Sequence, residues 1–343
     1  MRVTIKDVAK EAGVSIATVS RVFNGYTDIS EATKNRIMKI AKEMDYLPNT
    51  AARSLASKTQ VTIALILNDF EMNRKSTMAM EVLSGVYDYT EEHQIEFVFF
   101  ATSRIKQGKK SFREFCNEKA ITGAVVQGLK VNDPYYKEIL ESQLPVALID
   151  MWADKESICS ISIDNVKAST EAVAYLIDQG HQHIGMINGR REAAVSIDRE
   201  TGYVNALKKH QIPLTENYVQ YANFNEKIAV EIARDLLINQ PQLTALFCAS
   251  DLMAIGAMKA VGELGLSIPE DISIIGFDDI ILNEYLVPKL SSISQNMEKI
   301  GYEAAKNVYK LIKKEVAERQ VYIEHGLIIR ESVGPAVKKL RSM

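Results

Sequence analysis

Cysteine is scarce in this chain of 343 residues, and the spacing of the few cysteines excludes two kinds of stabilising site. Cys116, Cys159 and Cys248 lie too far apart for a structural zinc site or an evident disulfide framework. We expect three buried free thiols in a reducing compartment. Long apolar runs are also lacking, because the longest, near residues 61–67, falls short of the ~18 residues that span a membrane. Since no secretion signal is evident either, the sequence predicts a cytoplasmic protein without a membrane anchor.

Catalytic motifs are missing as well. The sequence has no glycine-rich phosphate loop, no G-x-S-x-G elbow and no paired His–Cys nucleophile. His181 and His183 have no further metal ligands nearby, so hydrogen bonding within a loop is favoured over a metal site. We predict no catalytic residues, no metal and no cofactor. A plain sugar-transport protein would need a secretion signal and would leave residues 1–58 unexplained.

The charge balance is uneven along the chain. In total, 41 basic and 44 acidic side chains give a formal charge of −3. Residues 1–60 hold 10 basic and 6 acidic side chains, a charge of +4, whereas residues 61–343 hold 31 basic and 38 acidic side chains, a charge of −7. A small basic head on a large acidic body indicates that only the head faces a polyanion.

The head has the pattern of three short helices. Thr4 and Asp7 resemble a capping box at the start of the first helix, Gly13 ends it, and Ser15 and Ser30 can cap the second and third. The inner faces are Ile5, Val8, Ala9 and Ala12 in the first helix, Val19, Val22 and Phe23 in the second, and Ile37, Ile40, Ala41 and Met44 in the third. A turn of about three residues around Gly13 gives the first two helices helix-turn-helix spacing.

Packing of the second helix turns one polar face outward. Ala17, Thr18 and Arg21 then lie near its amino-terminal half, where side chains of a recognition helix meet base edges. The alternative is an ordinary helical bundle in which Arg21 is merely solvated. The local positive charge favours the DNA-reading interpretation.

The same residues carry a family resemblance. The segments VTIKDVA (3–9), AGVS (12–15) and ATVSRVFN (17–24) resemble the head of LacI/GalR-type bacterial repressors, and YLPN (46–49) and ARSLA (52–56) resemble the hinge that follows it. The resemblance implies that residues 50–58 form a short helix only on operator DNA, which fits a segment below the ~12–15 residues of a marginally stable isolated helix.

The resemblance also implies individual DNA contacts. Ile16, Ala17 and Arg21 resemble base-reading positions, with Arg21 a candidate for a guanine edge. Positions that resemble phosphate anchors are Thr4, Ser15, Thr18, Ser20, Asn24, Ser30, Thr33 and Asn49. In the hinge, the implied contacts are Ala52 and Leu55. Leu55 would be the apolar wedge inserted between base steps, with packing against the body as the alternative.

The body alternates short apolar runs with helical patterns, which is typical of an α/β fold with parallel sheets. The runs lie at 61–67, 96–100, 123–126, 145–149, 184–187, 244–247 and 272–277, and the clearest helical patterns at 168–179, 199–210, 228–239 and 252–264. About 280 residues exceed one comfortable core, so we expect two lobes with a cleft between them.

The body also resembles a type I periplasmic-binding-protein fold, through GHQHI (180–184), ASDLMAIGA (249–257) and PEDISIIGFDD (269–279). Three crossings between the lobes are implied near 161–164, 290–294 and 322–326. The expected organisation is a helix-turn-helix head (1–48), a hinge (49–60), a first lobe (61–162 and 292–324) and a second lobe (163–291 and 325–343).

Ligands of such lobes bind beyond the carboxyl ends of the strands, which predicts cleft-facing polar residues. These are Asn68, Gln127, Asp150, Ser250 and Asp278. By resemblance, Arg199 is the arginine that grips the effector and Phe224 the aromatic plate. One aromatic plate, several carboxylates and a guanidinium suit a neutral sugar. The alternatives are a helix-capping role for Asp278, a core position for Phe224 and a surface ion pair for Arg199. Trp152 could add a second stacking face or lie at the lobe interface.

Together these features predict a sequence-specific transcription regulator that represses carbohydrate genes. Its partners would be double-stranded operator DNA and a small-molecule effector, a sugar bound between the lobes. The alternative is a catabolite-control-type regulator whose co-effector is a phosphorylated carrier protein, a branch that tends to lack the cleft arginine. No leucine-heptad tail follows Pro335, so we expect a homodimer rather than a tetramer.

Overall fold

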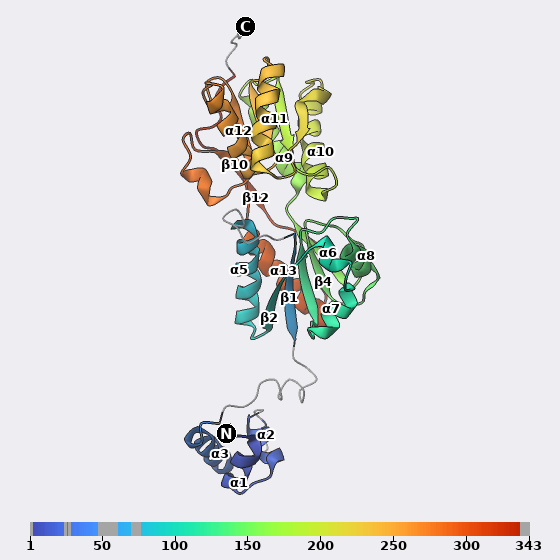
Figure 1. Cartoon of the computed structure of the whole chain (residues 1–343), viewed down its shortest axis with the longest axis vertical. Helices are drawn as coiled ribbons and strands as arrows, with labels where there is room; N and C mark the ends of the chain where they lie inside the picture. Colours follow the sequence, from blue (N-terminus) through green and yellow to red (C-terminus); the bar gives the residue numbers. More distant parts are fainter. Residues whose placement is uncertain (1–2, 24–25, 27–28, 47–60, 70–76, 337–343) are drawn as a thin grey trace. The chain divides into compact units, whose positions relative to one another are not determined.

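The computed structural model describes residues 3–23, 26, 29–46, 61–69 and 77–336, and the chain divides into two compact units, 1–60 and 61–343. The first unit is a three-helix head (Figure 1). Its helices are α1 (Ile5–Ala12), α2 (Ile16–Phe23) and α3 (Glu31–Glu43). Val8, Val19 and Ile37, one from each helix, are fully buried in a shared core, as the apolar spacing predicts.

Local signals in the sequence set the ends of these helices. Gly13 ends α1 with a left-handed φ of 61°, a conformation that glycine adopts without strain. The Ser15 hydroxyl oxygen accepts a hydrogen bond from the Thr18 backbone N–H at 3.1 Å, and Ser30 caps α3 through the Thr33 N–H. The turn between α1 and α2 is therefore fixed by its own residues.

The first lobe of the body is a six-stranded parallel sheet, in the order β11-β5-β4-β3-β1-β2. The strands are β1 (Thr62–Asn68), β2 (Glu96–Thr102), β3 (Gly123–Gln127), β4 (Val146–Ile149), β5 (Ile158–Ser162) and β11 (Gln320–Tyr322). The helices are α5 (Thr77–Glu92), α6 (Arg104–Gln107), α7 (Phe112–Glu118), α8 (Pro134–Glu141) and α13 (Met297–Lys313). Alternate residues of β1 enter two cores: Leu65 packs with α5 and α13, and Ile66 packs with α7 and α8.

The second lobe is another six-stranded sheet, in the order β12-β10-β9-β8-β6-β7. Its strands are β6 (Ile184–Asn188), β7 (Val219–Tyr221), β8 (Ala245–Cys248), β9 (Ser273–Asp278), β10 (Ser291–Gln295) and β12 (His325–Ile328). Its helices are α9 (Asn165–Asp178), α10 (Ala194–Lys209), α11 (Glu226–Asn239) and α12 (Asp251–Glu263), with 3-10 turns η1 (Glu216–Tyr218) and η2 (Ile281–Glu284). All pairings are parallel except that of β12 with β10. A helical head with a two-lobed α/β body confirms the predicted fold class.

Three segments connect the lobes: β5 to α9, β10 to α13, and β11 to β12. The second connection differs from the expectation, because Ser291–Gln295 pairs with β9 and belongs to the second sheet. Residues 292–295 therefore lie in the second lobe, and the chain crosses only after Gln295. The sequence of this strand, SSISQ, is mostly polar, but the Ser292 hydroxyl is buried and donates to Asp251 Oδ1 at 2.6 Å.

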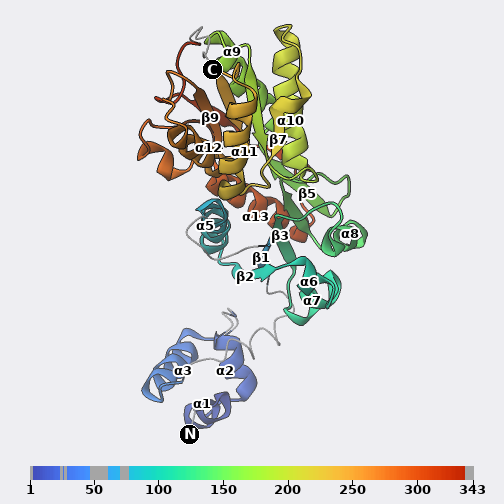
Figure 2. The same ribbon diagram turned by 45° about the horizontal axis from the view of Figure 1, so that its top comes forward.

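Helices of the body pair closely at glycines. A Cβ at Gly85 of α5 would lie 1.8 Å from the Glu298 carbonyl oxygen, and a Cβ at Gly301 of α13 would lie 2.2 Å from that of Val82. Both views show α5 and α13 side by side (Figures 1 and 2). Gly202 brings α10 onto α9 in the same way, and Gly256 brings α12 onto α11. At these glycines the backbones of the paired helices approach each other directly.

Candidate functional site

The head presents one exposed face on α2. Ile16, Ala17 and Arg21 are exposed, whereas Val19 and Val22 on the opposite side are buried. The Arg21 guanidinium carbon lies 5.2 Å from the centre of the Tyr26 ring, which is itself exposed. The structure thus brings together the three side chains that the sequence predicts as base-reading.

Several predicted phosphate anchors cap helices. Thr4 donates its backbone N–H and its hydroxyl to Asp7 Oδ2, and the Ser15–Thr18 and Ser30–Thr33 hydroxyl pairs lie 2.9 Å apart at the starts of α2 and α3. Ser20 is half-buried on α2. The predicted contacts outside the described residues are Asn24, Asn49, Ala52 and Leu55, together with the hinge that contains the last three.

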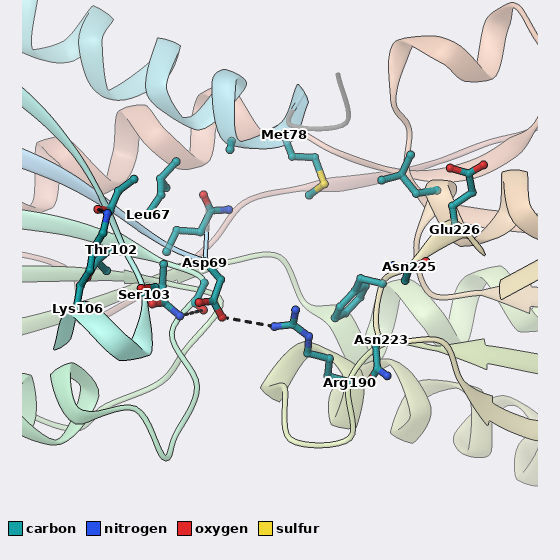
Figure 3. A pocket seen from close by; sticks show the side chains of 17 residues that line it. Leu67, Asp69, Met78, Thr102, Ser103, Lys106, Arg190, Asn223, Asn225 and Glu226 are labelled. Carbon is teal, nitrogen blue, oxygen red and sulfur yellow. Dashed lines mark hydrogen bonds and ion pairs between the residues drawn. The ribbon is translucent and has the colours of Figure 1, made fainter. Parts of the chain in front are cut away.

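The body has a cavity of about 810 Å³ between its lobes (Figure 3). First-lobe residues at the ends of β1, β2 and β3 line one side, and second-lobe residues after β6 and β7 line the other. Three of the seven predicted effector residues, Asn68, Gln127 and Phe224, contribute to this lining. The edges where parallel strands end therefore do form the cavity, as expected for such a sheet.

Asn68 braces the first-lobe wall. Its amide nitrogen donates to Gly128 O at 3.1 Å and to Asp133 Oδ2 at 3.2 Å, and its Oδ1 accepts from Gln107 Nε2 at 2.7 Å. Gln107 and Asp133 are buried. The hydrogen bonds of the Asn68 side chain are thus formed within its own lobe, where they hold the loop that follows Gln127.

Phe224 is positioned by its backbone and by a glycine. Asn223 and Phe224 both have left-handed φ values, 55° and 57°, which turn the chain after β7. A Cβ at Gly189 would lie 2.1 Å from Phe224 Cζ, so the ring packs directly on the Gly189 backbone. One side of the ring is held by Gly189 while the residue lines the cavity.

Arg199 and Asp278 lie together inside the second lobe and do not line this cavity. Arg199 is 3% exposed, donates from Nε to Asn165 Oδ1 at 2.9 Å and from Nη1 to Ala249 O at 2.7 Å, and stacks 3.7 Å over the Phe277 ring. Its Nη1 is 3.9 Å from Asp278 Oδ1. Burial raises the pKa of Asp278, and the neighbouring guanidinium opposes that rise.

Asp150 and Ser250 have other local partners. Asp150 Oδ1 accepts from the Ser162 hydroxyl at 2.6 Å, and the residue lines a smaller hollow of about 280 Å³ with Trp152 and Tyr322. Trp152 is 49% exposed and does not line the larger cavity, but the smaller hollow that it lines also includes the second-lobe residues Asn165 and Ala194. Ser250 caps α12 by accepting from the Met253 N–H.

The buried carboxylate of Asp251 was not identified from the sequence. It accepts from the Ile280 N–H at 2.9 Å, from Asn283 Nδ2 at 2.7 Å and from the Ser292 hydroxyl at 2.6 Å. Burial raises the pKa of this carboxyl group, against the lowering effect of these donors. Asp251 therefore ties the start of α12 to β10 and to the turn before η2.

Four charged residues that line the cavity were also missed. They are Asp69, Lys106, Arg190 and Glu226. Asp69 directly follows β1, and Arg190 lies two residues after β6, so the rule that ligands meet the carboxyl ends of strands could have found both. In Figure 3 the Arg190 guanidinium points across the cleft toward Asp69.

Metal-binding and membrane-spanning features were searched among the described residues. No group of three or more His, Cys, Asp or Glu side chains there could hold a metal ion. His181 instead bonds Thr244 Oγ1 at 2.9 Å and Gly334 O at 3.0 Å. In the same part of the chain, no helix is both long and apolar enough to cross a bilayer. The three cysteines are free and buried, as predicted.

Comparisons with known proteins match both units. Residues 4–49 match the family of bacterial regulatory proteins of the lacI type, and residues 173–333 match a periplasmic binding protein-like domain. The chain is 31% identical to the probable transcriptional repressor ExuR of Bacillus subtilis, over 96% of this chain and 98% of that protein. It is 30% identical to catabolite control protein A of Priestia megaterium, over 97% of this chain and 99% of that protein. Among solved structures, the complex of the transcriptional regulator CelR with cellobiose is 29% identical, with a TM-score of 0.73 over 96% of this chain and all of that one.

Proposed function

Because this chain belongs to the lacI family of bacterial regulatory proteins, it is a DNA-binding transcription regulator and not an enzyme, and we propose that a small sugar controls its operator affinity. In this proposal a homodimer represses carbohydrate-utilisation genes from a pseudo-palindromic operator, one head per half-site, in the cytoplasm where the chromosome lies. The observation that carries the DNA-binding step is the exposed face of Ile16, Ala17 and Arg21 on a capped, well-packed helix.

The face of α2 suits the major groove. Arg21 can donate two hydrogen bonds to a guanine edge, whereas Ile16 and Ala17 offer methyl groups that contact thymine methyls or sugars. The hydroxyl groups at the starts of α2 and α3 lie beside the first-turn backbone N–H groups, and such helix starts favour phosphate oxygens. The capped ends of α1, α2 and α3 would hold these groups in register with the duplex.

The cavity between the lobes supports a small-molecule switch. A ligand there contacts both lobes, so it can favour one lobe arrangement over the other, and only such differential affinity shifts DNA binding. The relative CelR is described in complex with cellobiose, which supports a sugar. A cavity between two lobes with an aromatic residue in its wall favours this effector over a carrier protein docked on the outer surface.

A second copy of the chain has an apolar surface available to it. Ile281, Leu282 and Tyr285 are 60%, 45% and 75% exposed on and after η2. Exposed apolar side chains in one short segment are typical of a protein interface. They support the homodimer that two operator half-sites require. The segment 337–343 lies outside the described residues.

Selection of binding sites from random duplexes by the full-length protein tests the DNA step. We expect enrichment of a two-fold symmetric site, and a steep loss of affinity with added salt. Arg21→Ala should cost about 1–3 kcal/mol on the selected site and relax one base position. Arg36→Ala, which removes the same charge from the exposed side of α3, is the matched control and should leave base preference unchanged. Equal loss on all duplexes in Arg21→Ala would make Arg21 a phosphate contact, and no preferred site at all would refute the proposal.

A further inference from the structure

Cations from both lobes line the cleft, although the body as a whole is acidic. Residues 61–343 carry 31 basic and 38 acidic side chains, a formal charge of −7. Among the described residues that line the cavity, the charged ones are Asp69, Lys106, Arg190 and Glu226. Lys130 is outside the lining but donates to Asp69 at 3.0 Å and so neutralises one of these acids. With Asp69 neutralised by Lys130, the cavity holds the two cations Lys106 and Arg190 against the one anion Glu226, a balance that favours an anionic ligand.

Arg190 is the cation that lacks a close acidic partner. Lys130 already occupies Asp69 Oδ2 with a hydrogen bond, and Arg190 Nη1 lies 3.9 Å from the same oxygen, beyond hydrogen-bond distance. Within the part of the chain that the structure describes, Asp69 is the only acid within 4.0 Å of this guanidinium. The Arg190 side chain is 42% exposed and lies on the second-lobe wall of the cavity.

Lys106 adds to the positive potential on the opposite wall. Its Nζ donates to the Ala101 backbone carbonyl at 3.2 Å, and among the described residues it forms no ion pair. The two cations therefore belong to different lobes, Lys106 to the first and Arg190 to the second. A negative group that enters the cleft is therefore attracted by both cations.

The rest of the lining requires hydroxyl donors and an apolar ring face. Gln127 Oε1 is buried and has no hydrogen-bond partner within the described structure, so it needs a donor that a ligand hydroxyl would supply. Phe224, held from behind by Gly189, offers an aromatic surface to the C–H face of a sugar ring. Asn68 is already saturated by its own lobe.

We propose that the effector is an anionic sugar, a sugar acid or a sugar phosphate, whose negative group pairs with Arg190 while a hydroxyl donates to Gln127. This inference rests on the proposed function and names its ligand class. Arg190 has donors left for the negative group, because its Nη1 lies beyond hydrogen-bond distance of Asp69, which Lys130 already neutralises. Bound ligand then bridges the two lobes through Arg190 on one side and Gln127 on the other.

Calorimetric titration of the full-length protein with matched sugar pairs tests this. Galacturonate is compared with galactose, and glucuronate and glucose 6-phosphate are compared with glucose, at low and at physiological salt. We expect one anionic sugar to bind at least about tenfold more tightly than its neutral parent, with affinity that falls as salt rises. Which anion binds distinguishes a carboxylate ligand from a phosphate ligand.

Variants separate the ion pair from a general effect on folding. Arg190→Gln should weaken the anionic sugar about tenfold or more and leave the affinity of the neutral parent within about twofold. Arg113→Gln, which removes an exposed cation from α7 away from the cavity, is the matched control and should change neither. Equal melting temperatures of the two variants without ligand would show that both fold.

Two results would overturn the inference, and they are distinguishable. If a neutral sugar binds as tightly as its anionic partner, or if Arg190→Gln weakens both equally, the anionic class is wrong while the sugar-controlled regulator stands. If none of the sugars binds although the protein selects an operator, the sugar effector itself is wrong and the anionic inference fails with it.

Discussion

Replacement of Arg199 by alanine should destabilise the second lobe. The guanidinium is 3% exposed and holds Asn165 Oδ1 and Ala249 O with two hydrogen bonds, while it stacks on Phe277. Its positive charge also lies 3.9 Å from Asp278, whose carboxyl group is buried. Arg199 therefore links α10 to the start of α9, to the end of β8 and to the end of β9.

The magnitude follows from what the substitution leaves behind. Two buried acceptors lose their donor, at about 1–3 kcal/mol each, and the stacking on Phe277, about 2 kcal/mol when desolvated, is also lost. The substitution also removes the free-energy cost of burying the arginine's charge, which offsets part of this loss of stability. Since breaking a buried ion pair from one side costs about 3–5 kcal/mol, we expect a decrease of that size in the free energy of unfolding.

Urea unfolding followed by far-ultraviolet circular dichroism measures the effect. Arg234→Ala is the matched control, because Arg234 pairs with Glu263 on the surface with both side chains 38% exposed, and its loss should cost about 0–1 kcal/mol. Arg199→Lys keeps the charge but loses the planar donor set, so its stability should lie between wild type and Arg199→Ala. If Arg199→Ala destabilises no more than Arg234→Ala, the assignment of Arg199 as a buried anchor is refuted.

Three further predictions concern the cleft, the buried network and the head. Gly189→Ala should displace the Phe224 ring, which lies 2.1 Å from the added Cβ, and weaken effector binding by about tenfold in titration. The control Gly262→Ala, whose Cβ would have nothing within 4 Å, should raise helix stability by about 0.5–1 kcal/mol. Unchanged effector affinity in Gly189→Ala would show that the Phe224 ring is not part of the site. Asp251→Ala leaves three buried donors without their acceptor, so urea unfolding should show a loss of about 3–5 kcal/mol, and a loss below about 1 kcal/mol would contradict this network. Ser15→Ala should cost about 1 kcal/mol in the stability of the head, seen as faster amide exchange in α2 but not in α3, and equal exchange in both would argue against a local cap.

The head was predictable because its signals are local. A capping hydroxyl, a left-handed glycine and an apolar residue at every third or fourth position each act within one helix, and α1, α2 and α3 begin or end where these residues occur. The outward face of α2, with Ala17, Thr18 and Arg21, follows from the buried one. The choice of Ile16, Ala17 and Arg21 as base-reading positions came instead from the resemblance to LacI/GalR-type repressors.

The strands of the body were only partly predictable, because apolar runs identify strands that are buried by apolar neighbours. Seven runs correspond to β1, β2, β3, β4, β6, β8 and β9. The missed strands are short or polar, and β10 is the clearest case. Its serines are buried through hydrogen bonds to Asp251 and Ser332, which are distant in the chain, so hydropathy alone could not reveal the strand or the second crossing.

The site shows a further physical limit. Polar residues at strand ends divide into those that bond within their own lobe and those whose polar atoms remain available. Asn68 and Asp278 belong to the first group. Asn68 accepts a hydrogen bond from the side-chain amide of Gln107 at 2.7 Å, and Asp278 accepts one from that of Gln295 at 2.8 Å. Gln127 Oε1 and Arg190 belong to the second.

Only the second group can decide ligand chemistry, because a ligand must offer more than the partners already bound. Membership depends on neighbours from other parts of the chain, such as Gln107 for Asn68 and Lys130 for Asp69. The sequence could therefore place the cavity at the strand ends. It favoured, however, a neutral sugar whose hydroxyl groups would donate to carboxylates. The groups left over, a guanidinium and an amide oxygen, instead favour a ligand that carries both a negative charge and a hydroxyl donor.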